Sequence, residues 1–544
     1  MGRPEFRRLR TWAACLVAVS LAGSAGAADP WVFEASPDAL RAHMAYLASD
    51  ELAGRDAGTP GYELAAAYVA RQFKEMGLRP LGDRGTFLQA VTLIQHRAGQ
   101  DGAIRIRRRL GGSVDLVLGQ DFRTAAAPHG RDVSITAPAV FAGFGIVAPN
   151  VGRDDFAGLN LRGKIVVVLD GAPPQIDAAD RPFVSSARAK AVMAQRRGAV
   201  GLIVISEASA APQLGLTPPA PWSWTWATPD GDAAYAGVPV LATVRADAAW
   251  KLFGGSAKRF EAILASAKTG GPPPRFHLPG RFEVFAAGEL GERRASHNVV
   301  GLIEGADPKL KSEYIVMSGH LDHIGVGAPV EGDAINNGAL DNAGGISTLI
   351  EAARGFATGP RPKRSVIFLA VTAEEKGLVG SDYFVRNPPV PQKKIVADVN
   401  LDMPVMTYDF VDVAAIGAEH SDIVSAVERA AAKMDVKVSP DPIARLGVFT
   451  RSDHYRFVEQ GIPAVFLVGG FMNGGDAAFN AFYDKRYHRP NDDLSQPIDY
   501  GVAAKWARLN YEIARELADQ PNRPLWLKDD LFGGRFADAD ASAP

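Results

Sequence analysis

Five residues with metal-binding side chains occur in the second half of the chain: His320, Asp341, Glu375, Asp402 and His488. Imidazole and carboxylate groups are the donors that zinc and similar divalent ions prefer. Two ions that share one bridging carboxylate need about five protein ligands in total. This set of donors therefore indicates a hydrolase that works with two metal ions.

The elements that must position these donors are strands and helices that alternate from Ser296 onward. Strands are expected at residues 299–303, 314–319, 365–372, 395–401 and 464–468, and helices at 343–356, 377–386, 421–434 and 500–518. Such alternation predicts an α/β domain with a mostly parallel sheet that is covered on both faces. Ligands of such sheets bind outside the carboxyl ends of the strands, so the donors that follow these strands should meet at one rim.

The N-terminal segment has the layout of a signal peptide. Four arginines within the first ten residues precede the apolar run Trp12–Ala22, and Ala25–Ala27 offer small side chains at a cleavage site. The apolar run is too short for a comfortable membrane span. We therefore expect residues 1–28 to be cleaved, and the mature protein to be secreted or periplasmic without a transmembrane anchor. The only cysteine, Cys15, would leave with this segment, so the mature chain would contain no disulfide.

Composition and charge exclude several other classes of protein. A length of 544 residues predicts more than one domain, and contents of 47% hydrophobic and 22% charged residues are those of a globular protein. The net charge of −2 argues against nucleic acid as a main partner. The composition thus predicts packed domains that do not bind nucleic acid.

The region before Ser296 does not show this regular alternation of strands and helices. Two helices are expected within residues 37–77, on either side of the Gly-rich, turn-forming stretch SDELAGRDAGTPG. Further on, short strands are expected at 86–94, 140–144, 164–169, 200–205 and 238–243, one helix at 185–197, and proline-rich loops at 208–221 and 270–279.

These patterns divide the mature chain into three parts. We expect an enzyme domain formed by residues 29–130 and 286–523, and an inserted domain at residues 131–285. Residues 524–544 are mixed in composition and rich in Asp and Ala, which predicts a loosely held C-terminal tail.

Six motifs carry a resemblance to a known family. In chain order they are SGHLDHIG, NGALDNAGG, TAEEKGLVGS, NLDM, RSDHY and YHRPNDD, and together they resemble the M28 family of co-catalytic zinc aminopeptidases. The stretch HMAYLASDELAGRDAGTPG is similar to the N-terminal part of secreted bacterial members, and FAGFGIVAPNVGRDDFAGLNLRGKIVVV resembles a protease-associated (PA) domain. The resemblance implies a phosphorylase/hydrolase-like three-layer zinc peptidase domain with a mostly parallel central sheet, and an inserted β-rich α/β PA domain.

The resemblance also implies a role for each donor. It assigns His320 and Asp402 to one zinc ion, Glu375 and His488 to the other, and Asp341 to both ions as their bridge. Manganese or cobalt could replace zinc. A hydroxide held between the two ions would then attack the peptide carbonyl.

Glu374 stands beside a ligand but is left without a metal. A carboxylate next to the attacking water is what a general base requires, because it takes a proton from that water and returns it to the leaving amine. Adjacent glutamates suit this division of roles, since they leave the strand end in different directions. We expect Glu374 to be the catalytic base, and the alternative is a solvated surface charge.

Two aspartates are expected to support the histidine ligands. Asp322 lies two residues after His320, on the same side of an extended segment, and could accept a hydrogen bond from its imidazole. Asp492 could serve His488 in the same way, or it could be a simple loop carboxylate.

Three further residues lie in the family motifs. Asp453 and Tyr455 belong to RSDHY, which is expected near the site. Tyr455 could donate to the oxyanion that develops during the reaction, or it could pack in the core. His323 is expected to form hydrogen bonds or to line the pocket rather than to bind metal.

The function expected from these residues is the removal of N-terminal residues from peptides. A carboxypeptidase, a dipeptidase or another amide hydrolase stays open, because metal ligands determine the chemistry and not the end of the substrate. A glutaminyl cyclase-like enzyme with one zinc ion is a second alternative. A non-catalytic binding protein is a third, although such relatives usually lose ligands and this chain has the full set.

Overall fold

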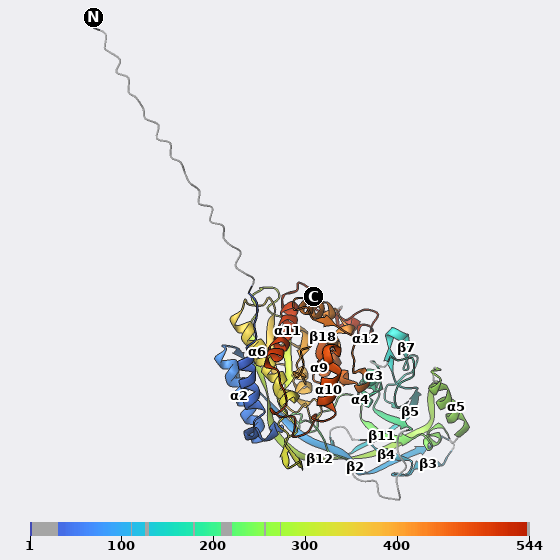
Figure 1. Cartoon of the computed structure of the whole chain (residues 1–544). Helices are drawn as coiled ribbons and strands as arrows, with labels where there is room; N and C mark the ends of the chain where they lie inside the picture. The colour runs from blue at the N-terminus through green and yellow to red at the C-terminus, as the bar shows by residue number, and fades with distance from the viewer. Residues whose placement is uncertain are drawn as a thin grey trace. The chain divides into compact units, whose positions relative to one another are not determined.

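The computed structural model describes residues 1–2, 31–109, 111–125, 130–177, 180–207, 220–254, 257–271 and 274–540. The expected signal peptide, apart from its first two residues, and most of the expected loop at 208–221 lie outside these ranges. The contacts divide the chain into two units, Met1–Val32 and Phe33–Pro544, and the second contains all the helices and strands that are described below (Figure 1). Within the described ranges, no helix combines the length and the apolar character needed to cross a membrane.

Four parallel strands form the centre of the sheet that carries the predicted donors. In spatial order they are β20 (Ala464–Gly469), β17 (Ile395–Asn400), β13 (Tyr314–His320) and β16 (Ser365–Val371). Their side chains are almost all buried, because both faces of the sheet are covered. Four of the five expected strands and their parallel arrangement are therefore confirmed, whereas the fifth, 299–303, runs antiparallel to β16.

Helices cover both faces of this sheet. One face packs against α1 (Pro37–Leu47), α2 (Pro60–Glu75), α6 (Gly344–Thr358), α8 (Ile423–Ala432) and α11 (Tyr500–Asp519), and the other against α7 (Val379–Arg386) and α9 (His454–Glu459). Successive strand residues point to opposite faces, so Met317 joins the first helical layer and Val316 the second. The three-layer α/β fold that the sequence predicts is the observed fold.

The edge of the sheet beyond β20 contains strands that the alternating pattern did not predict. Strand β18 (Asp412–Ile416) runs antiparallel to β20 and pairs in parallel with the two-residue β19 (Lys437–Val438). A short strand that follows another strand without an intervening long helix departs from the β-α alternation, and this is why the pattern missed it.

Two long strands continue the sheet beyond the four parallel strands. Strand β12 (Arg275–Ile303) pairs with β16 at its C-terminal end and with β5 (Val133–Ala142) at its N-terminal end, and β2 (Leu88–Arg107) pairs with β12 along most of its length (Figure 1). The expected linker at 270–279 is therefore wrong in its second half, because β12 already begins at Arg275. Ladder hydrogen bonds extend a strand through residues whose local sequence resembles a loop.

The predicted insertion contributes the far part of the same sheet. Its parallel strands follow β5 in the order β8 (Ile165–Leu169), β9 (Gly201–Ser206) and β11 (Val240–Arg245). Helix α4 (Ala187–Arg196) covers one face, where its apolar side chains pack on these strands. The same part of the chain also contains β6 (Val147–Ala148), β7 (Arg153–Asp154), β10 (Ser223–Trp226), α3 (Arg181–Ser185) and α5 (Ala257–Lys268). Two short strands from before the predicted insertion, β3 (Ser113–Leu116) and β4 (Phe122–Thr124), pair with β2 and β11.

The described beginning of the C-terminal tail, up to Phe536, is packed rather than loosely held. The tail contains α12 (Leu531–Asp540), and the side chains of Trp526, Leu531 and Phe532 are buried. The Phe532 ring lies 4.7 Å from that of Phe183 in α3, between ring centroids. The Asp/Ala-rich composition concealed these apolar anchors, whose burial against the insertion stabilises the tail.

A buried ion-pair cluster attaches the insertion to the helices α7 and α9. Arg188 of α4 contacts Asp382 at 2.6 Å and Glu459 at 3.2 Å. The indole of Trp226 donates to the second oxygen of Asp382 at 2.8 Å. Although burial opposes it, Arg188 lowers the pKa of Asp382 well below its usual range. The insertion is thus held by charged groups that are largely withdrawn from water.

Replacing Arg188 by Met is expected to lower the free energy of unfolding by about 2 kcal/mol, because it removes the cation that Asp382 and Glu459 share and leaves each of them with one arginine partner, Arg386 or Arg456. Urea unfolding followed by circular dichroism measures this loss.

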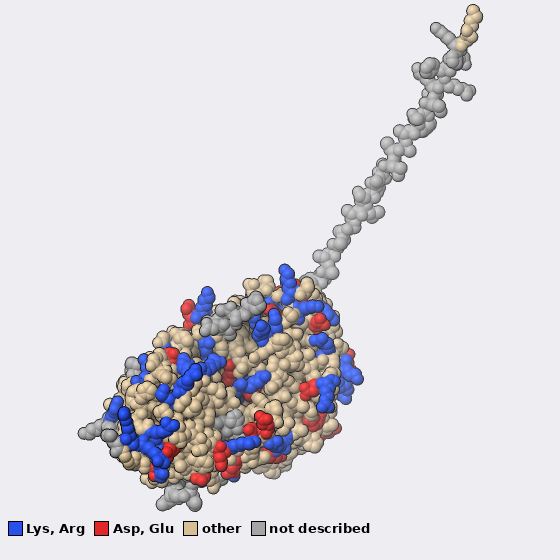
Figure 2. Space-filling view, turned by 180° about the vertical axis from the view of Figure 1, so that it is seen from behind, with Lys and Arg blue, Asp and Glu red and all other residues tan. Residues whose placement is uncertain are grey.

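Most ion pairs among the described residues are more exposed, and Figure 2 shows basic and acidic side chains side by side on one face. Arg71→Met, which removes the exposed Arg71–Glu75 pair, is the control and should cost less than about 1 kcal/mol. Equal costs for the two variants would contradict the anchoring role of Arg188.

Candidate metal centre

The carboxyl ends of the parallel strands bring three of the predicted donors together. His320 is the last residue of β13, Asp402 follows β17 by two residues, and Glu375 follows β16. The turn before the two glutamates passes through Ala373, whose φ of +55° reverses the chain direction at the strand end. Because neighbouring parallel strands end at the same edge, these side chains meet at one rim.

The other two donors arrive from loops. Asp341 lies in the short turn η6 (Ala339–Ala343), directly before α6, and its own backbone is not helical, with φ −114° and ψ 87°. His488 lies between α10 (Gly475–Tyr483) and α11, with a φ of +58°. Their position at the same rim is therefore a product of the tertiary fold and not of strand order.

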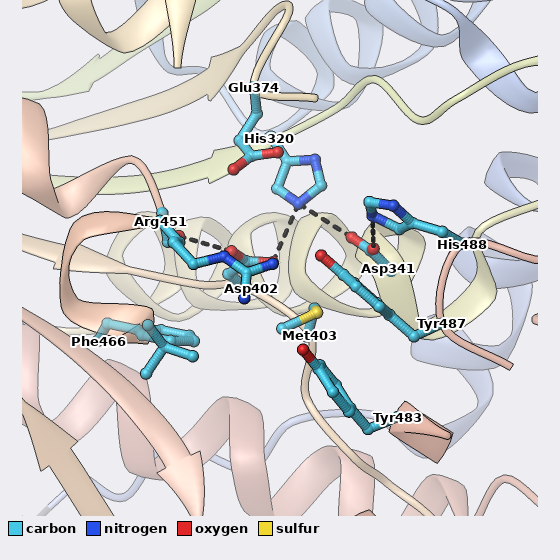
Figure 3. Close-up of a pocket in the computed structure, with 12 residues that line it drawn as sticks. His320, Asp341, Glu374, Asp402, Met403, Arg451, Phe466, Tyr483, Tyr487 and His488 are labelled. Carbon is cyan, nitrogen blue, oxygen red and sulfur yellow. Dashed lines mark hydrogen bonds and ion pairs between the residues drawn. The ribbon is translucent and has the colours of Figure 1, made fainter. Parts of the chain in front are cut away.

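The five side chains form two pairs joined by one carboxylate, and Figure 3 shows four of them: His320, Asp402, Asp341 and His488. His320 Nε2 lies 3.0 Å from Asp402 Oδ1 and 3.2 Å from Asp341 Oδ1. His488 Nε2 lies 3.1 Å from Glu375 Oε2 and 3.3 Å from Asp341 Oδ2. Each oxygen of Asp341 thus faces a different histidine and a different carboxylate.

These spacings fit divalent metal ions. Ligand atoms of His320, Asp341 and Glu375 lie within 4.8 Å of one another. Two donors that bind one zinc ion at about 2.0–2.2 Å and at tetrahedral angles would lie about 3.3–3.6 Å apart, which is close to the observed distances. The donor set contains only nitrogen and carboxylate oxygen, as zinc, manganese and cobalt accept.

The charge of the site also calls for cations. Although burial opposes it, hydrogen bonds with Asp341 and Glu375 raise the pKa of His488 to about 10. Burial raises the pKa of Glu375, but hydrogen bonds from His323 and His488 outweigh this effect and lower the pKa to about 2. Without metal, protons on the histidines therefore provide the positive charge that these buried carboxylates require.

Glu374 faces the cavity but belongs to neither pair (Figure 3). Burial raises the pKa of Glu374 well above its usual range, and the nearby carboxylates of Glu375, Asp402 and Asp453 add to the rise. A carboxylate in this environment accepts a proton readily. Glu374 is therefore not the solvated surface charge that was the alternative to a catalytic base.

Asp322 contacts His320 through its backbone and not through its carboxylate. The backbone carbonyl of Asp322 lies 3.1 Å from His320 Nδ1. Its carboxylate instead accepts hydrogen bonds from the backbone N–H groups of Glu374 at 3.1 Å and Glu375 at 3.3 Å. The prediction of a side-chain contact was wrong, because the turn after β13 directs the carboxylate toward the end of β16.

Asp492 supports the Asp341 turn and not His488, which was the predicted partner. Its two oxygens accept hydrogen bonds from the backbone N–H groups of Leu340 and Asp341, each at 3.0 Å. Asp492 therefore orients the turn that carries the shared carboxylate and makes no described contact with His488. His323 also supports a donor, since its Nδ1 lies 2.8 Å from Glu375 Oε1.

The two RSDHY residues lie beside the cavity but do not line it. Asp453 is buried and accepts a hydrogen bond from Ser381 at 2.6 Å, and burial raises its pKa to about 7. Tyr455 packs in the core, 5.9 Å from the Phe183 ring between centroids. The packing alternative holds for Tyr455, and its oxyanion role is not supported.

Several residues that the sequence did not single out line the cavity. They are Met403, Val448, Arg451, Ser452, Phe466, Tyr483 and Tyr487. Ser452 donates to Asp402 Oδ2 at 2.5 Å, and the Tyr487 ring stacks on His488 with centroids 3.8 Å apart. Tyr487 is the first residue of the motif YHRPNDD and precedes a predicted ligand, and these two signals could have identified it.

The fold and the donor set are those of the metallopeptidase class. Residues 298–514 match the sequence profile of Peptidase family M28, and this range contains all five donors and Glu374. This part of the chain is therefore similar to the peptidases of family M28.

Individual relatives are distant. A "Probable zinc metalloprotease" from Pyricularia oryzae is 28% identical over 48% of this chain and 57% of its own length. The "Probable lipoprotein aminopeptidase LpqL" of Mycobacterium tuberculosis is 24% identical over 88% of this chain and 84% of the relative. Among solved structures, a zinc aminopeptidase from Bacillus subtilis matches with 18% identity and a TM-score of 0.43, over 89% of this chain and 96% of that one. The chain spans about half or less of the length of the first curated relatives it matches.

Proposed function

We propose that this protein is a secreted or periplasmic aminopeptidase with two zinc ions that removes N-terminal residues from peptides. One observation carries the proposal: the two oxygens of Asp341 face separate histidine and carboxylate pairs, while Glu374 stands beside them without a partner among those pairs. His320 and Asp402 would hold one ion, and Glu375 and His488 the other. The chain's similarity to a zinc metalloprotease and to an aminopeptidase supports this assignment.

When bound, the two ions would supply Lewis-acid activation of water and of the peptide carbonyl. Glu374 would take a proton from the attacking water and return it to the leaving amine, as a carboxylate with a raised pKa is suited to do. Asp322 would hold the Glu374–Glu375 backbone in place through its two hydrogen bonds, so that one side chain reaches the water and the other the metal.

Tyr487 is placed to stabilise the oxyanion. Its hydroxyl is directed toward the donor cluster in Figure 3, and stacking on His488 restricts its ring. Burial raises the pKa of Tyr487, so the phenol keeps the proton that it would donate. An oriented donor that acts on charge formed only in the transition state raises kcat more than substrate affinity.

Tyr487→Phe is therefore expected to lower kcat about 100-fold with little change in KM or zinc content. Steady-state kinetics on an unblocked peptide amide measures both constants. Tyr500→Phe removes a hydroxyl at the start of α11 and serves as the control that keeps kcat. A Tyr487→Phe enzyme with unchanged kcat would remove this residue from the mechanism.

The cavity lining supports recognition of the amino end. Glu374 and Asp402 offer negative charge to an α-ammonium group, and Met403, Val448 and Phe466 offer an apolar wall to the first side chain. Arg451 also lines this cavity, and its guanidinium favours a carboxylate, so a carboxypeptidase or dipeptidase is the second candidate.

Hydrolysis of matched peptides distinguishes these candidates. The protein loaded with zinc should release the first residue from unblocked peptides and spare their N-acetylated forms, whereas amidation of the C-terminus should have no effect. Chelation should abolish turnover, and zinc should restore it. Equal cleavage of acetylated and unblocked peptides would contradict action at the amino end, and loss of cleavage on C-terminal amidation would favour a carboxypeptidase. One bound ion per chain would favour the cyclase-like alternative.

The division into a signal peptide, a discontinuous peptidase domain and an inserted PA domain is part of the same proposal. Mass spectrometry of the exported protein should find that residues 1–28 have been removed. A mature protein that retains Trp12–Ala22 would contradict the export route.

A further inference from the structure

A buried arginine from outside the M28 range lies beneath the candidate metal centre. Arg55 ends the short 3-10 helix η1 (Asp50–Arg55), between α1 and α2, in the Gly-rich stretch of the N-terminal part. Its side chain is 1% exposed, although the stretch is polar and turn-forming. A fully buried guanidinium is costly unless its hydrogen-bonding groups are satisfied.

Backbone carbonyls of two ligand-bearing loops satisfy this guanidinium. Arg55 Nε donates to the carbonyl of Leu321 at 3.0 Å, which is the residue after His320. The Arg55 Nη groups donate to the carbonyls of Asn337 at 2.6 Å and Gly338 at 3.0 Å, just before the turn that carries the shared aspartate. A third contact reaches the carbonyl of Leu47 at the end of α1. One rigid fork therefore connects both loops to the N-terminal helices.

The backbone around Arg55 reinforces this connection. The carbonyl of Arg55 accepts a hydrogen bond from the N–H of His323 at 3.3 Å, and that of Gly54 accepts from Gly325 at 3.1 Å. Gly54 has a φ of +70°, and a Cβ at this position would lie 2.5 Å from the carbonyl oxygen of Asn336. The close approach of three backbone segments explains the glycine.

Charge gives the arginine a second link to the site. None of its described hydrogen bonds goes to a carboxylate. Burial lowers the pKa of Arg55 to about 10, and the fields of Asp341, Asp492, Asp322 and Glu375 oppose that decrease. The side chain is therefore a permanent cation that faces the acidic groups of the donor cluster.

We propose that Arg55 is a positioning residue for the metal centre, which holds the His320 loop and the Asp341 loop at the separation that metal binding requires and offsets the charge of the surrounding carboxylates. This inference rests on the proposed function to the extent that the site binds divalent metal. It assigns the N-terminal segment, which lies outside residues 298–514, a direct part in forming the site.

Arg55→Lys tests the proposal, because it keeps the charge and removes the fork. The affinity of the full-length protein for zinc, measured by competition with a chromophoric chelator, is expected to fall about 10- to 100-fold, as for other residues that orient metal ligands. The visible absorption spectrum of the cobalt-loaded variant should change as well, because the ligand geometry changes. Arg55→Met should lower the affinity at least as much, since it removes the charge too.

Arg364→Lys is the matched control. Arg364 is also fully buried and donates to the carbonyl of Leu517 at 3.2 Å, but it precedes β16 and lies at the opposite end of that strand from the donors. This control should lower the melting temperature without changing zinc affinity or the cobalt spectrum. Wild-type zinc affinity in Arg55→Lys, or an equal loss in Arg364→Lys, would overturn the proposal.

A second variant keeps the test decisive if Arg55→Lys does not fold. Asn337 ties the same loop to α1 through hydrogen bonds to the Ala48 carbonyl at 3.0 Å and to Asp50 at 2.8 Å. Asn337→Ala is expected to lower zinc affinity several-fold, and unchanged affinity would then overturn the proposal. Because zinc binding is measured without substrate, a wild-type protein that binds zinc but cleaves no peptide would contradict only the proposed activity.

Discussion

Replacing Glu374 by Gln is expected to lower kcat about a thousandfold while both metal ions stay bound. The amide keeps the size of the side chain but cannot take up the proton of the attacking water. Glu374 contacts neither histidine ligand within the described ion pairs, so its loss should leave the donor pairs intact. A thousandfold decrease corresponds to about 4 kcal/mol of transition-state stabilisation.

The pH profile makes this test specific. Glu374 must be deprotonated to act as a base, and burial raises its pKa. The activity of the unsubstituted enzyme should therefore be lost as the pH falls through that pKa, whereas the residual rate of Glu374→Gln should not follow this limb. Metal analysis of the variant checks that zinc is retained, and Glu428→Gln, at an exposed position on α8, is the control. An unchanged kcat in Glu374→Gln would show that another group is the base.

Asp341→Asn is expected to remove at least one of the two metal ions and to abolish turnover. An amide has one acceptor oxygen and no charge, so it cannot serve both donor pairs as Asp341 does. If about 10–16 kcal/mol of zinc binding is shared among four ligands, each ligand contributes about 2.5–4 kcal/mol, or about two to three orders of magnitude in affinity. Loss of a shared ligand affects both ions.

Metal content and thermal unfolding measure this effect. Zinc should raise the melting temperature of the unsubstituted protein and a chelator should remove the increase, because metal binds the folded state preferentially. The melting temperature of Asp341→Asn should differ little between zinc and chelator. Asp333→Asn, at an exposed position of β15 (Asp333–Ile335), is the control that keeps it. Two tightly bound ions in Asp341→Asn would contradict the bridging role.

The alternation of apolar strands and amphipathic helices after Ser296 was sufficient to predict the α/β domain. Runs such as Ser365–Val371 are buried on both faces, and this burial leaves a clear signature in the sequence. The same signature places His320, Glu375 and Asp402 at strand ends. The sequence alone could not predict the length of β2 and β12, because ladder hydrogen bonds with neighbouring strands extend them through locally weak segments.

Supporting contacts were predicted less well than donors. Asp322 and Asp492 were expected to hold histidines, and both instead accept hydrogen bonds from the backbone of neighbouring loops. Spacing along the chain indicates which residues share a side of a strand, but it does not indicate which loop lies opposite. Arg55 was missed for the same reason, since its hydrogen-bond partners come from distant segments.

The sequence by itself determined the chemical types of the donors, their order along the chain and the strand ends that carry three of them. These properties follow from local periodicity, which residues encode within one element. The tertiary structure alone decided that the two oxygens of Asp341 face different pairs, that Glu374 is left to face the cavity, and that Arg55 joins the two ligand loops. These properties depend on contacts between segments far apart in the chain, and such contacts arise only when the apolar faces of the sheet and helices pack together.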